Sequence, residues 1–431
     1  MSAAGALKDA LSPVWRRVKA VWESLSSKCR WAYGRRLARE ATVKPNKVVL
    51  SCNFGRGYLC NPKYIAEALE RLYPGEFDLV LLVKESDNGL PGYLRQVKYR
   101  SREAQRELAT ARFWVYNFRN DEKFVPKRDG QIYIQTWHAC LGPKRSEGDV
   151  ADQLGDSYLA AAQYDGSITD FMIANNRLEA EKYQRAFWYS GPVVRAGVPR
   201  NAPLIRPADT LGQKMRRVLG VDEGVAICLY APTFRADWSF EQYEFDFQAV
   251  VEALEARFQR PFVFAYRLHP NLASKPRPNF FLQHIDATDY EDTQQLLAAT
   301  SVLISDYSSI MEDFLLTGRP GFQYIPDLAD YMDDRGLYYP LERRPYPIAS
   351  NEKELLAAIE SFDFEVFEKK RRAFFEYAGF VEDGKGDERI ANLMHDLASP
   401  ESSVSCVFEP GEIWDRPVTA YDNQHPRMRE D

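Results

Sequence analysis

The sequence predicts two Rossmann-like α/β domains that face each other. Three observations support this prediction. The 431 residues suit two domains of about 150 to 200 residues each. Short apolar runs alternate with amphipathic helical patterns, as in parallel sheets with helical crossovers. A segment punctuated by glycine and proline, residues 197–203, divides this alternation into two series. We therefore expect an N-terminal domain over residues 46–200 and a C-terminal domain over 201–397.

The individual elements follow from hydrophobic periodicity. In the first series we expect a helix over 61–73 and strands over 47–52, 78–84, 113–118, 131–138 and 171–176. In the second series we expect strands over 225–230, 262–268, 280–285, 302–305 and 321–325, and helices over 244–258, 291–299 and 307–317. Residues 352–397 resemble three helices.

The two ends of the chain differ from this pattern. Residues 1–45 are predicted to be a basic amphipathic segment, since the first 50 residues hold eleven Lys and Arg against three Asp and Glu. Its helix either packs on the first domain or lies on an anionic membrane surface, with Trp15, Trp22 and Trp31 at the headgroup level. Residues 398–431 are predicted to be a polar acidic tail.

Composition excludes several classes of protein. A net charge of −6 argues against nucleic-acid binding, and six scattered cysteines without a Cys-x-x-Cys pair argue against disulfides and structural zinc. No apolar stretch is long enough to span a bilayer. We therefore expect a cytoplasmic protein, peripheral on the inner membrane surface.

Two histidines follow predicted strands, where ligands of open α/β sheets bind. His138 ends the run Gln135-Thr136-Trp137-His138 and could act as a general base, or could simply cap a loop. His269 follows the second-domain strand over 262–268, and Arg267 alternates with it, so both could reach one anion.

Two further strand exits carry polar side chains. Asp306, Ser308 and Ser309 precede a predicted helix, whose N-terminal N–H groups suit a diphosphate, although simple helix capping explains them equally well. Thr233 and Arg235 follow the strand over 225–230. Arg235 could clamp a phosphate or form a surface ion pair with Asp237.

Motifs of other enzyme classes are missing from the sequence. Gly55-Arg56-Gly57 lacks the third glycine of a dinucleotide-binding loop, and neither a Walker lysine motif nor a zinc-protease motif occurs. We see no carboxylate cluster with metal-ligand spacing. The sequence therefore requires no cofactor or metal, and magnesium is left as an optional aid to catalysis.

Taken together, the motifs resemble the CDP-glycerol glycerophosphotransferases, which build teichoic acids and related capsule polymers. The resemblance runs from about Ser51 to Ile390. It is carried by 57–62, by Gln135-Thr136-Trp137-His138, by 230–235, by Arg267-Leu268-His269-Pro270, by 305–309 with Asp313 and Arg319-Pro320, and by 383–389. Ala139 and Cys140 stand where the family often has glycine and threonine.

The resemblance implies a GT-B fold, in which the C-terminal domain holds a CDP-glycerol or CDP-ribitol donor. It implies that His138 deprotonates a hydroxyl of a lipid-linked or polymer acceptor, which attacks the β-phosphorus and expels CMP. His269 would contact the diphosphate. We expect further substrate contacts from Thr233, Arg235, Arg267, Asp306, Ser308, Ser309 and Asp313. The alternatives are a GT-B glycosyltransferase that uses a nucleotide sugar, a ribitol-specific enzyme, and a non-catalytic scaffold.

Overall fold

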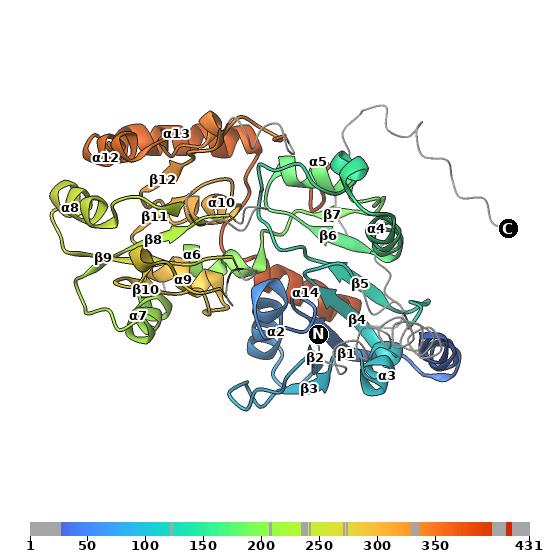
Figure 1. The fold of residues 1–431 in the computed structure, drawn as a ribbon. Helices are drawn as coiled ribbons and strands as arrows, with labels where there is room; N and C mark the ends of the chain where they lie inside the picture. The colour runs from blue at the N-terminus through green and yellow to red at the C-terminus, as the bar shows by residue number, and fades with distance from the viewer. Residues whose placement is uncertain are drawn as a thin grey trace, which may run out of the picture.

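The structure is a computed structural model that describes residues 27–120, 124–206, 209–233, 240, 243–269, 272, 275–328, 336–398 and 411–415. These residues form two α/β lobes, each built on one parallel sheet (Figure 1). The expectation of two Rossmann-like domains is confirmed at this level.

The first sheet has seven strands in the order β3-β2-β1-β4-β5-β6-β7. The strands are β1 (Lys44–Ser51), β2 (Asp78–Val83), β3 (Leu94–Lys98), β4 (Ala111–Tyr116), β5 (Ile132–Gln135), β6 (Phe171–Ile173) and β7 (Val193–Val194). The helices between them are α2 (Cys60–Leu72), α3 (Arg102–Thr110), α4 (Asp156–Ile168) and α5 (Arg177–Ala186).

The second sheet has six strands in the order β10-β9-β8-β11-β12-β13. They are β8 (Ala226–Ala231), β9 (Phe262–Tyr266), β10 (Ile285–Asp286), β11 (Val302–Ser305), β12 (Gly321–Tyr324) and β13 (Ile348–Ala349). The helices of this part of the chain are α6 (Ala202–Ile205), α7 (Asp209–Val218), α8 (Phe247–Phe258), α9 (Thr293–Ala299), α10 (Ile310–Leu315), α12 (Glu352–Glu360), α13 (Phe364–Ala378) and α14 (Gly386–Leu397).

Burial on both faces explains the continuous apolar runs in the central strands. In β1, Val48 and Leu50 join the core on one face of the sheet, and Val49 joins the core on the other. In both sheets the strand order reverses beside the first strand, between β1 and β4 and between β8 and β11. Doubly wound sheets bind ligands at the carboxyl ends of the strands beside such a reversal.

The peripheral strands are the ones that periodicity missed. β3 lies at an edge and has the sequence LRQVK, whose residues are partly exposed, while β7 and β13 contain two residues each. The expected strand over 280–285 is wrong for most of its length, because a 3₁₀ turn occupies Asn279–Phe281 and β10 covers only Ile285–Asp286. Short edge segments bury too few side chains to produce a periodic signal.

Helix α14 packs on the first sheet, although we expected residues up to 397 to belong wholly to the second domain. Ile390, Ala391, Met394 and Leu397 join Ile65 and Leu69 of α2 in the core that covers one face of the first sheet. The Arg112 guanidinium caps the end of α14 by donating to the Leu397 carbonyl at 3.0 and 3.1 Å. The chain therefore returns to the first lobe after α13 (Figure 1).

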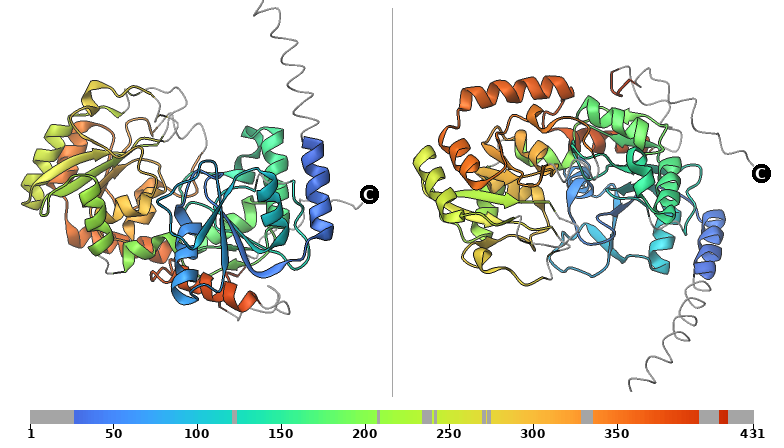
Figure 2. Two further views of the ribbon diagram at one scale, coloured as in Figure 1. Left: turned by 90° about the horizontal axis from the view of Figure 1, so that it is seen from below. Right: turned by 45° about the horizontal axis from the view of Figure 1, so that its top comes forward.

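Residues 27–40 form a helix that packs on the first domain, on the outer side of the lobe (Figure 2). The Trp31 ring meets the Phe124 ring edge-on, with the ring centroids 6.0 Å apart. The Arg30 guanidinium lies over the Phe124 ring, 4.0 Å from its centroid. Of the two alternatives that the sequence left open, the structure shows packing on the first domain for Trp31. Trp15 and Trp22 lie outside the described residues.

Part of the expected C-terminal tail pairs with the first sheet. Residues 411–415 run antiparallel to β7, where the Arg195 amide donates to the Glu412 carbonyl at 2.7 Å and the Trp414 amide donates to Val193 at 2.9 Å. The Trp414 side chain packs against the apolar cluster that contains Tyr189 and Val193. This segment therefore covers the outer edge of the sheet, and the remainder of 398–431 lies outside the described residues.

The position of α14 gives a testable prediction. Ile390 of α14 and Ile359 of α12 are both fully buried, but in the cores of different sheets. Either isoleucine-to-alanine change should cost about 2–5 kcal/mol, through lost burial and the cavity it leaves. Hydrogen exchange should show that Ile390→Ala weakens protection in β1 and β2, whereas Ile359→Ala weakens it in β8 and β11. Loss of protection in the second sheet on Ile390→Ala would contradict the placement of α14.

Candidate active site between the two sheets

The predicted site residues follow the carboxyl ends of strands in both sheets. His138 comes after β5, Thr233 after β8, His269 after β9, and Ser308 after β11. The loop after His138 reaches the second domain: a Cβ placed on Gly142 would lie 3.6 Å from the Ser309 Cβ, and Lys144 forms a β-bridge with Leu337. The two groups of predicted residues therefore meet at the domain junction.

His138 is held by its backbone and by aromatic neighbours. Its Nδ1 lies 3.0 Å from the Asn117 carbonyl oxygen, which can only accept, so Nδ1 carries the proton and Nε2 keeps its lone pair. The imidazole stacks on Phe118 at 4.1 Å with the rings nearly parallel. Trp137 precedes it in the left-handed region (φ 51°), which is rare for a bulky residue and typical of functional sites.

The environment of His138 favours the neutral imidazole. Burial lowers its pKa to about 3 despite the opposing hydrogen bond to Asn117, and the positive charges of Arg200, Lys182 and Arg119 lower it further. At neutral pH the ring is therefore uncharged, with its one proton on Nδ1. Such a group can accept a proton from a hydroxyl that is placed at Nε2.

Arg200 connects the His138 loop to the second domain. Its guanidinium donates a short hydrogen bond to the His138 carbonyl and pairs with Asp313 of α10 at 2.7 Å. Its backbone amide donates to the Asn61 side chain at 3.1 Å, and the amide group of Asn61 donates to the Trp137 carbonyl at 3.0 Å. Arg200 thus fixes the main chain around His138 against α10.

The role of Asp313 differs from the one we expected, and Arg200 was not expected at all. The Asp313 carboxylate, which we expected to contact substrate, is 2% exposed and accepts from Arg200 and from Gln294 at 2.9 Å. Sequence reasoning missed Arg200 because it lies in the segment 197–203, where glycine and prolines indicated only a domain boundary. No sequence signal distinguished it from other arginines.

Three cations lie near enough to act on His269 electrostatically. Burial lowers the pKa of His269, and the positive charges of Lys144, Arg267 and Arg56 lower it further. These three cations come from the His138 loop, the exit of β9 and the loop after β1. Arg267 donates to the Tyr290 carbonyl at 3.4 Å, and Lys144 lies over the Tyr307 ring at 5.8 Å. The expected proximity of Arg267 to His269 is therefore present, and the assembled charge suits a diphosphate.

The turn after β11 is held from both sides. The Asp306 carboxylate accepts from the backbone amide and the hydroxyl of Thr233, each at 3.0 Å, which ties the exit of β8 to the exit of β11. Arg344 is buried beside Glu312 and donates to the Asp306 and Ser308 carbonyls at 2.7 and 3.1 Å. Asp306 and Thr233 thus shape the turn. Sequence reasoning did not find Arg344.

The serines stand at the start of α10, which begins at Ile310 and is shorter than the expected helix over 307–317. The Ser308 hydroxyl accepts from the Ile310 amide at 3.4 Å, and the Ser309 side chain makes no capping hydrogen bond. Capping therefore explains Ser308 in part and leaves the Ser309 hydroxyl available. Arg235 lies outside the described residues.

The described residues were searched for groups of side chains that could hold a metal ion. Within them, no group of three His, Cys, Asp or Glu side chains could hold a metal ion. Likewise, none of the helices in the described ranges has the length and apolarity that crossing a membrane requires.

Comparison with known proteins identifies the family. The family model described as CDP-Glycerol:Poly(glycerophosphate) glycerophosphotransferase matches residues 33–396. The chain belongs to this family. The family to which the sequence was expected to belong is thus confirmed.

Relatives and solved structures agree with this assignment. The chain is 28% identical to a teichoic acid poly(glycerol phosphate) polymerase of Staphylococcus epidermidis over 83% of its own residues, and spans about half (51%) of that relative's length. It is 29% identical to a teichoic acid ribitol-phosphate primase of Bacillus spizizenii, over 63% of this chain and 71% of the relative. A structure of the wall teichoic acid polymerase TagF, soaked with CDPG, is similar with a TM-score of 0.76 at 26% identity, covering 90% of this chain and 98% of that one. The expected GT-B type of fold is confirmed by this likeness.

The lowered pKa of His138 predicts how stability depends on pH. An unfolded histidine binds a proton near pH 6.5, whereas folded His138 does so only near pH 3. Between these values the unfolded chain binds more protons than the folded chain. The free energy of unfolding therefore decreases as the pH is lowered, by at most about 1.4 kcal/mol per pH unit from this group. His138→Asn can still donate to Asn117 and should make the decline shallower. Denaturant unfolding from pH 7 to pH 4 measures it, and parallel profiles for the two proteins would contradict the assignment.

Proposed function

We propose that the chain transfers glycerol phosphate from CDP-glycerol to a hydroxyl of an acceptor and releases CMP, in the synthesis of a teichoic acid type of polymer. The observation that carries this proposal is the loop from His138 to Lys144. It has a fixed, neutral imidazole at one end and, at the other, a cation that acts on His269 together with Arg267 and Arg56. A base for the acceptor and a cationic site for the donor are therefore joined by one short segment.

The reaction can be written with these groups. His138 Nε2 takes the proton of the acceptor hydroxyl, whose oxygen forms a bond to the β-phosphorus of the donor. The bond between that phosphorus and the oxygen bridging to CMP breaks, and CMP leaves with the electron pair. Lys144, Arg267 and Arg56 offset charge on the phosphates, and positioning with electrostatic stabilisation supplies most of the catalysis in phosphoryl transfer.

Donor binding also explains how so weak a base could act. Nearby positive charges add to burial in lowering the pKa of His138. A bound diphosphate brings negative charge to the same junction, which offsets those cations and raises this pKa toward the range suited to a general base. Proton transfer would then be coupled to occupancy of the donor site.

Ribitol phosphate is the second candidate for the transferred group. The similarity to a ribitol-phosphate primase supports it, and the cations near His269 suit the phosphates that CDP-glycerol and CDP-ribitol have in common. Membership of the family argues against the nucleotide-sugar glycosyltransferase that the sequence left open. No metal enters the proposed steps, and magnesium would act on the phosphates alone.

The proposal predicts release of CMP from CDP-glycerol or CDP-ribitol, but not release of UDP from UDP-sugars, when a synthetic lipid-linked acceptor is present. His138→Ala should lower the rate by at least about a hundredfold, the low end for general-base catalysis. His284→Ala is the matched control, because His284 packs against Phe247 and Phe264 in the second core and should leave the rate near normal.

Mass spectrometry of the products assigns the alditol and the number of units added. Near-normal CMP release by His138→Ala would overturn its role as the base. The absence of CMP release from both CDP-alcohols, in a protein that still binds them, would favour the scaffold reading over the enzyme.

The acceptor and the membrane belong to the same proposal. We infer that the acceptor is lipid-linked or a growing polymer, and that the chain works on the cytoplasmic face of the membrane. The basic composition of residues 1–45 supports this location, since cationic side chains are drawn to anionic lipid. The helix over 27–40 would then present its exposed residues, including Lys28 and Arg36, to the surface.

Removal of the basic segment tests this location. A protein that begins at residue 27 keeps the helix that packs on Phe124 but loses the preceding cations. A smaller fraction of it than of the full chain should sediment with anionic vesicles. Neither protein should sediment with neutral vesicles. Equal sedimentation of the two proteins with anionic vesicles would show that residues 1–26 are not the membrane contact.

A further inference from the structure

A cavity of about 650 Å³ opens at the amino ends of the strands of the second sheet, opposite the candidate active site. Its lining includes Phe262 at the start of β9, Ser301 directly before β11, and Arg319 and Pro320 directly before β12. Parallel strands all begin on one side of the sheet and end on the other. This cavity lies where the strands begin, away from His269 and the Ser308 turn, which lie where they end. With four residues in β11, roughly 13 Å of sheet separates the two edges.

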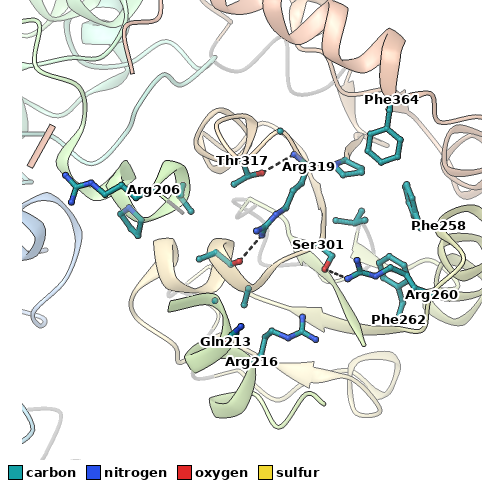
Figure 3. A pocket seen from close by; sticks show the side chains of 18 residues that line it. Arg206, Gln213, Arg216, Phe258, Arg260, Phe262, Ser301, Thr317, Arg319 and Phe364 are labelled. Carbon is teal, nitrogen blue, oxygen red and sulfur yellow. Dashed lines mark hydrogen bonds between the residues drawn. The ribbon is translucent and has the colours of Figure 1, made fainter. Parts of the chain in front are cut away.

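Three guanidinium groups converge on this cavity. Arg216 comes from α7, Arg260 from the end of the α8–β9 loop, and Arg319 from the turn before β12 (Figure 3). Among the described residues that line the cavity there is neither Asp nor Glu. A fourth lining arginine, Arg206, points away and pairs with Asp387 of α14. The cavity is therefore strongly positive.

The hydrogen bonds of the converging arginines leave their charge in place. Arg260 donates to the Ser301 hydroxyl at 3.1 Å, and Arg216 donates to the Asp222 carbonyl at 2.9 Å. Arg319 donates to the carbonyls of Ala298 and Thr300 at the end of α9, at 2.8 and 2.6 Å. These partners are neutral. The pKa of Arg216 is lowered by partial burial and then by the charge of Arg260, which places the two cations within each other's field.

Aromatic side chains form the remaining wall. The rings of Phe258 and Phe262 lie 6.0 Å apart, as do those of Phe258 and Phe364. Phe364 is 49% exposed, so its ring is accessible from solvent. An organic group could cover this wall while the attached anion meets the arginines. The volume is in the range of small-molecule sites.

We propose that this cavity is a second binding site, specific for a phosphate ester. The planar guanidinium matches two phosphate oxygens at once, and Arg216 and Arg260 face the same space from two elements. Phe258, Phe262 and Phe364 receive the organic part. Because the cavity lies on the far edge of the sheet, its ligand can be held while the candidate active site is occupied.

Two phosphate esters arise in the proposed reaction, the nucleotide CMP and the glycerol phosphate chain, and this choice of sources rests on the proposed function. The site itself does not, since it follows from the cavity and its charges. Retention of the chain would keep an anionic product near the enzyme between additions, whereas retention of CMP would couple the second site to product release.

The test is a calorimetric titration of the full chain with three probes: CMP, a synthetic oligo(glycerol phosphate), and inorganic phosphate. Every protein carries His269→Ala, which weakens binding at the candidate active site. In that background, Arg216→Gln with Arg260→Gln should weaken binding of at least one ester about tenfold or more, as expected for charge-assisted hydrogen bonds. The matched control is Arg217→Gln with Arg372→Gln, which removes the same charge from outside the cavity.

The outcomes separate the sources and the proposal. A loss confined to the oligomer identifies the polymer as the ligand, and a loss confined to CMP identifies the nucleotide. Equal affinities in the two double variants for all probes would overturn the site, as would inorganic phosphate binding as tightly as both esters. Arg216 also holds the turn at Asp222, so the double variant could fail to fold. In that case Arg260→Gln alone carries the test, and it should weaken binding of the ester about fivefold. Binding is read without turnover, so the CMP-release experiment stays independent.

Discussion

The buried ion pair between Arg200 and Asp313 is the contact on which the site depends. Both side chains are nearly inaccessible to solvent, at 6% and 2% exposure. Arg200 comes from the linker between the two sheets (residues 197–206), and Asp313 comes from α10. Removal of one partner of such a pair typically costs about 3–5 kcal/mol, because the other charge stays buried. The same guanidinium donates to the His138 carbonyl, so one group links the main chain of the proposed base to α10 of the second lobe.

Further cross-domain contacts surround that pair. Lys63 of α2 pairs closely with Asp292 at the start of α9, and Tyr64 donates to the same carboxylate at 3.2 Å. Helix α14 adds a third link, since Asp387 receives hydrogen bonds from Arg71 of the first lobe and from Arg206 of the linker. These cross-domain contacts are charged and directional. Ion pairs with hydrogen-bond geometry hold the two lobes in one orientation.

Each sheet closes its point of strand reversal with a polar pair. In the first sheet, Asn53 and Asn117 exchange hydrogen bonds at 2.8 and 3.0 Å, and the Asn117 carbonyl then orients His138. In the second, Thr233 and Asp306 play the same part beside the serine turn. The two lobes thus hold their functional loops by similar means, with buried backbone and side-chain groups satisfied on either side of the junction.

The sequence by itself determined the fold class, the central strands and the loops that carry His138, His269 and the serine turn. It could do so because buried parallel strands leave long apolar runs, and because polar residues at strand exits stand out against them. It could not place β3, β7 or β13, whose short or half-exposed sequences carry little periodicity. It also assigned α14 to the wrong lobe, since an amphipathic pattern shows that a helix is buried but not against which sheet.

Only the tertiary structure decided the partners of the charged residues. Arg200, Arg344, Arg216 and Arg260 look like any surface arginine in sequence, and Asp313 looked like a ligand for substrate until its carboxylate was found against Arg200. Ion pairs and hydrogen bonds join residues more than a hundred positions apart, and their energies depend on distance and burial. Sequence spacing encodes neither, so the chemistry was visible in the motifs while its geometry required the fold.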